Sequence, residues 1–279
     1  MDATVVPADD SLADAMPELI EAQNIQFSYP QHRQENLPIL VDFSLAIRKG
    51  ECFCLLGPSG CGKTTVLRMI AGFQFPDSGR LTLEGRDITG PGVDRGVVFQ
   101  GDDSLFSWLD STDNVAFGLR MRGTERAARR QTARDFLRLV GLVGQDHKYP
   151  SELSGGMKQR IQIARVLAND PKVLLMDEPF GALDAQTRAE LQDEVVRIWM
   201  KTGKTILFIT HDIGEAILLG DRIGVMHSGP GSKIREIISV DIPRPRNRAT
   251  VEFGRLYEHI NRLIVEEVKL ARTSANVDH

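Results

Sequence analysis

The sequence has few cysteines, few aromatic residues and no long apolar run. Of its 279 residues, three are cysteine and 6% are aromatic. No apolar run approaches the ~18 residues that a membrane-spanning helix needs. The N-terminus also lacks the basic and apolar regions of a secretion signal. We therefore expect a chain that does not cross a membrane by itself and that works in the cytosol.

Positive charge is not in excess either. The 34 Lys and Arg residues are outnumbered by 38 Asp and Glu residues, which gives a formal net charge of −4. A surface that follows a nucleic-acid backbone usually makes a domain strongly basic. The balance therefore argues against nucleic acid as the main partner, and it assigns the arginine-rich stretch from 120 to 138 to a solvated helix face.

The three cysteines predict two different environments. Cys52 and Cys54 lie two residues apart on a predicted strand, so their side chains share one face. No further Cys or His stands near them at ligand spacing, which favours core residues over a metal site. Cys61 is expected beside a helix start and Lys63, which predicts a lowered thiol pKa and a reactive side chain.

A glycine-rich stretch gives the strongest signal. It fits the pattern G-x-x-x-x-G-K-[ST], follows an apolar run at 52–56 and precedes an apolar run at 66–70. A strand and a helix on either side distinguish a phosphate loop from a glycine turn with a surface lysine. Lys63 would reach the β- and γ-phosphates and Thr64 would bind Mg²⁺. The predicted nucleotide contacts are Gly57, Pro58, Ser59, Gly60, Cys61, Gly62, Lys63, Thr64 and Thr65.

Two carboxylates follow a second apolar run at 173–176. Asp177 and Glu178 are adjacent, so at the end of a strand their side chains can serve different tasks. Without a phosphate loop, a solvated loop start would be the better interpretation. Beside one, we expect Asp177 to hold Mg²⁺ and Glu178 to act as the general base toward water.

A third motif covers residues 153–160. Ser154 is a predicted helix N-cap, and Gly155 and Gly156 expose backbone N–H groups at the helix start. This is a second anion-binding device without a lysine. The simplest geometry is a head-to-tail dimer in which this turn of one subunit closes on the nucleotide held by the phosphate loop of the other.

With these three motifs, the chain resembles the ATP-binding-cassette family from Tyr29 to Met226. The resemblance implies that Tyr29 stacks on adenine, rather than only packing on the core. It gives Asp184, in the loop 181–184, a place at the dimer seam. It also implies that Gln100 contacts Mg²⁺ and the attacking water and that His211 contacts the γ-phosphate. From the residues alone, a lone Gln or His after a strand would be a surface or structural residue.

The fold class is predicted from the alternation of strands and helices together with the family resemblance. From residue 173 onward, predicted strands and helices alternate, which is typical of a parallel sheet covered by helices. The resemblance implies an α/β P-loop NTPase core, an N-terminal antiparallel β subdomain and an inserted α-helical subdomain. The expected divisions are a mobile acidic leader at 1–21, an ATPase domain at 22–240 with its helical subdomain at about 101–168, and a basic connector with a C-terminal helix at 241–279. Ser111 or Thr112 is the expected N-cap of the first inserted helix.

Four stretches resemble the nitrate/sulfonate/taurine importer group: 98–100 with Trp108 and Leu109 close behind, 113–118, 157–160 and 177–184. That resemblance implies an ATPase that acts as a homodimer at the cytoplasmic face of the membrane, with ATP and Mg²⁺ as cofactors. Its other partners would be separate transmembrane permease subunits and, indirectly, an extracytoplasmic solute-binding protein. We expect the permease to dock near residues 100–115; packing inside the helical subdomain is the alternative for these apolar side chains: Leu105, Phe106, Trp108 and Leu109. A soluble cassette ATPase for protein or cluster assembly is the alternative function.

Overall fold

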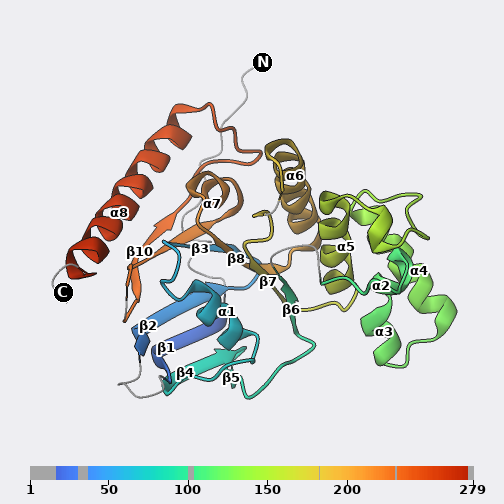
Figure 1. Cartoon of the computed structure of the whole chain (residues 1–279), viewed down its shortest axis with the longest axis horizontal. Coiled ribbons are helices and arrows are strands. Elements are labelled where there is room, and N and C mark those ends of the chain that lie inside the picture. Colours follow the sequence, from blue (N-terminus) through green and yellow to red (C-terminus); the bar gives the residue numbers. More distant parts are fainter. Residues whose placement is uncertain (1–16, 31–36, 100–103, 182, 230, 276–279) are drawn as a thin grey trace.

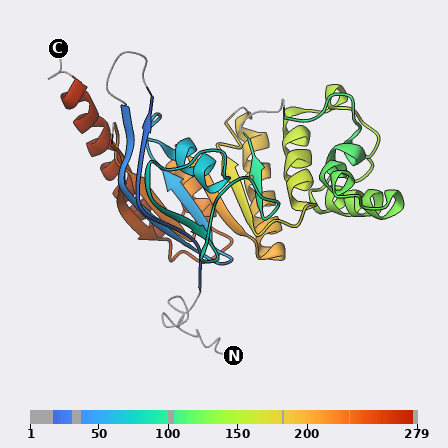
Figure 2. The ribbon, with the colours of Figure 1, turned by 90° about the horizontal axis from the view of Figure 1, so that it is seen from below.

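The computed structural model describes residues 17–30, 37–99, 104–181, 183–229 and 231–275. Two β-sheets with their covering helices form one part, and a group of helices forms a second part at the far end (Figures 1 and 2). The long C-terminal helix lies at the end of the molecule opposite these helices (Figure 1). This arrangement matches the predicted α/β core with an added β subdomain and an inserted helical subdomain.

The smaller sheet is antiparallel and has the strand order β2-β1-β4-β5. Alternate residues such as Ile25, Phe43 and Ile47 are buried, as the period of two in the sequence predicts. The first strand starts at Glu18, so residues 18–21 are not part of the predicted leader. Leu19 and Ile20 are buried there, and the acidic neighbours hid this in the sequence. The strands are β1 (Glu18–Tyr29), β2 (Leu37–Arg48), β4 (Ser78–Leu83) and β5 (Arg86–Asp87).

The larger sheet has the order β10-β9-β3-β8-β7-β6. Strands β9 to β6 run parallel, and β10 is an antiparallel edge strand. The predicted bounds 52–56, 173–177 and 205–210 agree with the structure, whereas β10 was not predicted. The strands are β3 (Cys52–Leu56), β6 (Arg95–Val98), β7 (Val173–Asp177), β8 (Thr205–Thr210), β9 (Arg222–Met226) and β10 (Ile234–Ser239).

Both faces of the larger sheet are covered, so its central strands are apolar on each side. Phe53 and Leu55 face one core, which they share with the smaller sheet and a helix that starts at Lys63. Cys52 and Cys54 face a second core on the opposite side, which confirms them as core residues. The helices that cover these faces are α1 (Lys63–Ile70), α6 (Ala185–Thr202) and α7 (Ile213–Leu219).

The helical part is inserted between β6 and β7, which are neighbours in the sheet. Its first helix has Asp110 as N-cap, because that carboxylate accepts the N–H of Asp113. The prediction of Ser111 or Thr112 as the cap was wrong: their hydroxyls donate to carbonyls of the 146–148 loop. The elements are α2 (Ser111–Val115), α3 (Phe117–Met121), α4 (Arg126–Leu139), the 3₁₀ helix η2 (Pro150–Glu152) and α5 (Gly155–Leu167).

The C-terminal region folds back on the core. In the basic connector, Arg246 is 8% exposed and donates to five backbone carbonyls. The last helix, α8 (Val251–Ala275), buries Phe253 and Ile260 in the second core, so its apolar stripe packs on its own domain. Within the described ranges, no helix combines the length and the apolar character that crossing a bilayer requires.

Candidate functional site

The glycine-rich loop connects the end of β3 to the start of α1. Gly62 precedes the helix with a φ of 96°, a left-handed conformation that glycine adopts without strain. Lys63 is the first helical residue and is only 5% exposed. Its ammonium group donates to the carbonyls of Gly57 and Pro58, at 2.7 and 2.9 Å. The lysine is thus held over the loop that carries the N–H groups for an anion.

A cavity of about 410 Å³ opens over this loop. It brings together residues from four parts of the chain: β1, β2, the glycine-rich loop with α1, and the end of β7. Most of its lining was predicted from the sequence. The lining residues are Tyr29, Ile39, Ser59, Gly60, Gly62, Lys63, Thr64, Thr65, Asp177 and Glu178.

Thr64 and Asp177 meet at the floor of the cavity. The Thr64 hydroxyl donates to Asp177 Oδ1 at 3.2 Å, across 113 residues of sequence. Burial raises the pKa of Asp177, and the charge of Glu178 raises it further, whereas the hydrogen bond from Thr64 opposes both. A hydroxyl and a carboxylate oxygen side by side are hard oxygen ligands of the kind that Mg²⁺ prefers.

Glu178 follows directly and has an unusual backbone. Its φ is +42°, a left-handed conformation that is uncommon outside glycine. Its N–H donates to the carbonyl of Ile209 on the neighbouring strand β8. Its carboxylate oxygen Oε2 lies 3.0 Å from Nδ1 of His211. The structure therefore joins two predicted catalytic residues into one pair at the rim of the cavity.

Tyr29 forms a side wall. Its hydroxyl lies 3.3 Å from the Thr65 hydroxyl and contacts Gln74, and its ring packs edge-on against Phe27. Burial would raise the pKa of Tyr29, but the hydrogen bonds from Thr65 and Gln74 and the charge of Arg68 lower it overall. The ring is half-buried and packs on Phe27, as the core-packing alternative expects, while its contact with adenine stays a prediction.

Cys61 differs from the sequence prediction. Its side chain is 1% exposed, and burial raises its pKa although Lys63 acts in the opposite direction. The sequence showed the nearby cation and the helix start but not the burial. The predicted low pKa of this thiol was therefore wrong.

The third motif does not reach the cavity. Ser154 caps α5 by accepting the N–H of Met157 at 3.4 Å, which confirms the predicted cap. Gly156 packs against α6 so closely that a Cβ there would lie 2.5 Å from Thr187 Cγ2. Asp184 caps α6 by accepting the N–H groups of Gln186 and Thr187. Neither Ser154, Gly155, Gly156 nor Asp184 lines the cavity.

Gln100 and Ile39 differ in how the sequence treats them. Gln100 lies outside the described residues, so its predicted role stays a prediction. Ile39 was missed: it lines the cavity from β2 and stands close to Gly62, where a Cβ would lie 3.1 Å from its Cγ2. An apolar residue in an apolar strand carries no chemical signature, so the sequence offered no signal for it.

A comparison with protein-family models matches residues 40–181 to the ABC transporter model. The matched range contains the phosphate loop, the serine–glycine turn and the Asp177–Glu178 pair. It therefore includes most of the cavity described above.

Curated proteins and solved structures are similar as well. The chain is 46% identical to the taurine import ATP-binding protein TauB of Pseudomonas aeruginosa, over 85% of this chain and 92% of that protein. It is 47% identical to the bicarbonate transport ATP-binding protein CmpC of Synechococcus elongatus, over 83% of this chain but 35% of that one. The fold is also similar to a dimeric structure of the ATP-binding cassette MJ0796 bound to ADP and Pi. The match extends over 80% of this chain and 99% of that chain, with 28% identity and a TM-score of 0.68.

Proposed function

The chain belongs to the ABC transporter family, and from this premise we propose that it is the ATP-hydrolysing subunit of a membrane importer for a small solute. The observation that carries the proposal is the cavity in which the lysine of the phosphate loop, Asp177 and the histidine-linked Glu178 converge. The relatives named for taurine import and bicarbonate transport support solute transport as its purpose.

The cavity is suited to a nucleoside triphosphate with its metal ion. Lys63 exchanges its contacts with loop carbonyls for the β- and γ-phosphates, and the helix start adds its positive dipole end. Thr64 Oγ1 and Asp177 Oδ1 lie 3.2 Å apart. These two oxygens would hold Mg²⁺, with Gln100 as a further expected ligand. When bound, Mg²⁺ neutralises charge on the phosphate oxygens. Tyr29 would contact the adenine ring at the side wall.

Hydrolysis then needs a positioned water molecule. Glu178 accepts a proton from that water as its oxygen attacks the γ-phosphorus, and the bond to the bridging oxygen of ADP breaks. His211 lies 3.0 Å from the Glu178 carboxylate, so it orients this base and lies at the rim where it would contact the γ-phosphate. Both side chains come from the carboxyl ends of neighbouring parallel strands, which fixes their spacing.

A second copy of the chain completes the site. The N-terminus of α5, with Ser154 as its cap, does not line the cavity of its own chain. We expect Ser154, Gly155 and Gly156 to close on ATP held by the phosphate loop of a partner copy, with Asp184 at the seam. The dimeric cassette that matches over 80% of this chain supports this arrangement.

The permease is expected to dock at the junction of the two parts. A groove of about 380 Å³ lies between β6 and the helical part, and its lining includes Phe99, Phe106 and Phe117. Beside it, Trp108 is 70% exposed, whereas Leu105 is buried inside the helical part. Trp108 is therefore the residue of this group that supports docking. The chain would sit as a peripheral subunit at the cytoplasmic face of the membrane, and a solute-binding protein would act through the permease.

ATP hydrolysis by the purified wild type and by Glu178→Gln, each followed by sizing in ATP, tests this function. We expect turnover to fall at least about 100-fold in the variant, with an ATP-trapped dimer. Full activity in the variant would exclude Glu178 as the base. Trp108→Ala tests coupling: solute uptake should fall while basal ATP hydrolysis stays unchanged. Unchanged uptake would exclude this docking surface.

A further inference from the structure

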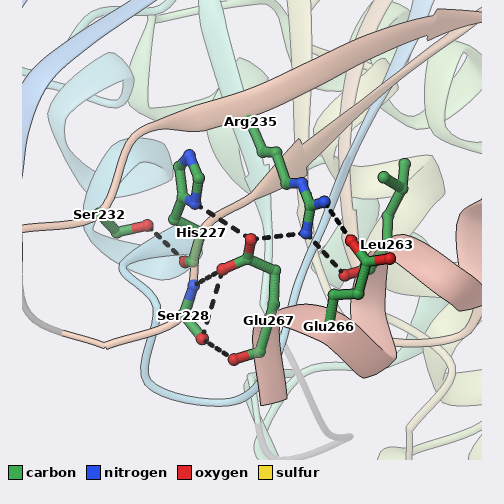
Figure 3. A network of polar contacts seen from close by, with 7 residues as sticks. All are labelled: His227, Ser228, Ser232, Arg235, Leu263, Glu266 and Glu267. Carbon is green, nitrogen blue, oxygen red and sulfur yellow. Dashed lines mark hydrogen bonds and ion pairs between the residues drawn. The ribbon is translucent and has the colours of Figure 1, made fainter. Parts of the chain in front are cut away.

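Glu267, on the C-terminal helix α8, is a buried carboxylate far from the cavity in sequence. It is 2% exposed. Figure 3 shows its side chain facing the loop between β9 and β10. Oε2 accepts the N–H of Ser228 at 2.9 Å, and Oε1 lies 3.1 Å from His227 Nδ1 and 2.8 Å from an Arg235 nitrogen.

These contacts favour the ionised carboxylate. Burial alone would raise the pKa of Glu267, but the N–H of Ser228, the charge of His227 and the hydrogen bond from Arg235 outweigh it and lower the pKa. The Ser228 hydroxyl also donates to the main-chain carbonyl of Glu267 (Figure 3). Glu267 thus joins helix α8 to His227 and Ser228, the two residues that follow β9.

The same loop is bonded to the wall of the nucleotide cavity. Ser232 is 1% exposed, and its hydroxyl donates to the carbonyl of His227 at 2.6 Å. The N–H of Ser232 donates to the carbonyl of Ile39, at 2.9 Å, and Val41 donates back to Ser232. Ile39 lines the cavity beside Gly62. A continuous path of hydrogen bonds therefore leads from Glu267 to that wall.

A second path runs along the backbone. His227 directly follows Met226, the last residue of β9. The side chain of Met226 lies against the first residue of the phosphate loop, because a Cβ on Gly57 would lie 3.2 Å from Met226 Cβ. The position of His227 therefore bears on both the start of the phosphate loop and the Ile39 side of the cavity.

We propose that Glu267 is a positioning residue for ATP: by fixing His227 and Ser228 from α8, it sets the cavity wall formed by Ile39 and the phosphate loop. The catalytic pair Glu178 and His211 lies on other strands and is not part of this path. Loss of the Glu267 carboxylate therefore weakens ATP binding and leaves the chemical step unchanged. This proposal requires ATP binding only, and it holds whether or not the protein drives solute import.

The test compares Glu267→Gln with the matched variant Glu266→Gln. The two residues are adjacent on α8 and both contact Arg235, but Glu266 is 58% exposed at its side chain, and its carboxylate pairs with Arg235 and not with His227 or Ser228. In Glu267→Gln, one carboxylate oxygen becomes an amide NH₂, which cannot accept a hydrogen bond. Either the N–H of Ser228 or the pair His227 and Arg235 therefore loses its acceptor. Both variants lose the same charge.

The measurements are KM and kcat for ATP hydrolysis, the Kd of a fluorescent ATP analogue, and the thermal midpoint. For Glu267→Gln we expect KM and Kd to rise about fivefold, the usual size of coupling through one hydrogen-bond network, with kcat within about twofold. Glu266→Gln should match the wild type in all ligand constants. A purely structural role would lower the thermal midpoint of Glu267→Gln and leave KM and Kd unchanged, and that result would overturn the proposal.

Ser232→Ala covers the case in which Glu267→Gln does not fold. It removes only the hydroxyl that links Ser232 to the His227 carbonyl. We expect a smaller rise in KM and Kd, about twofold, with kcat unchanged. Unchanged nucleotide affinity in Ser232→Ala would contradict the path from α8 to Ile39. Glu267→Asp adds a rescue test, because it keeps the charge and should recover part of the affinity.

Discussion

His211 Nδ1 lies 3.0 Å from Glu178 Oε2, although 33 residues separate them. The contact follows from the sheet: β7 and β8 are parallel neighbours, and Asp177 pairs with Ile209. Each functional side chain lies just beyond this pairing, at the carboxyl edge of its strand. Parallel strands bring such residues together without any local sequence signal, and this edge is where ligands bind in open α/β sheets.

Replacement of His211 by alanine should affect turnover more than binding. The variant leaves Glu178 without its orienting partner and removes the expected γ-phosphate contact, so kcat should fall about 100-fold while the Kd for ATP changes little. Steady-state hydrolysis and analogue binding measure the two quantities. His147→Ala is the control, since its side chain is 79% exposed on the helical part. A wild-type kcat in His211→Ala would refute the role of this pair.

Cys61 should react slowly with alkylating reagents at neutral pH. Burial raises its pKa above the ordinary 9.0, so the thiolate fraction at pH 7 is small, and the reaction rate should keep rising with pH beyond 9.0, where the rate of an ordinary thiol levels off. Mass spectrometry of iodoacetamide-treated protein across pH 7 to 10 identifies the modified cysteine and its rate. Rapid modification of Cys61 at pH 7 would mean that the thiol is more exposed or more acidic than this structure indicates.

Gly156→Ala should destabilise the fold by about 1–3 kcal/mol. The added methyl would lie 2.5 Å from Thr187 Cγ2 and push α5 away from α6. Gly155→Ala is the control, because its Cβ would meet Leu183 Cδ2 at an ordinary 3.5 Å. Urea unfolding measures the free energies. Adding Thr187→Ser, which removes Cγ2, should restore most of the lost stability; no recovery would show that the clash is not the cause.

Glu215 gives a prediction for the pH dependence of stability. It is 6% exposed, accepts hydrogen bonds from Thr210 and Gln192, and has a pKa raised by burial. The folded state therefore holds this proton more tightly than the unfolded state. Its contribution to stability is present below the ordinary pKa of 4.5 and is lost as the pH rises through the raised value.

Glu215→Gln removes that titration and keeps the size of the side chain. The free energy of unfolding, measured from pH 4 to 8 for both proteins, should fall less steeply with rising pH in the variant than in the wild type. Parallel curves would mean that the pKa of Glu215 is not raised in the folded protein.

Much of the core and part of the site could be predicted because their signals are local. The run Cys52–Leu56 is apolar throughout because β3 is buried on both faces, and the loop that follows is determined by its glycines and Lys63. The cap at Ser154 is also a local hydrogen bond. For such features, the residues that make the structure are next to each other in the chain.

The sequence predictions failed where residues far apart in the chain determine the environment of a side chain. The burial of Cys61 depends on packing from other elements, so its neighbour Lys63 was a misleading guide to its pKa. The cap of α2 is Asp110 because the two following hydroxyls are used by the 146–148 loop. Ile39 and Glu267 gave no signal, since their importance comes from contacts across the fold.

The order of strands in the larger sheet also limits when the chain can fold during its synthesis. Strand β3, which leads into the phosphate loop, lies between β8 and β9, and the N–H of Cys52 donates to Asp221, 169 residues later. Contacts of such long range form slowly, because a large loop of chain must close first. A nascent chain that ends before β9 therefore lacks a flanking strand for β3, and the strand that leads into the phosphate loop is fully paired only after residue 226 has been made.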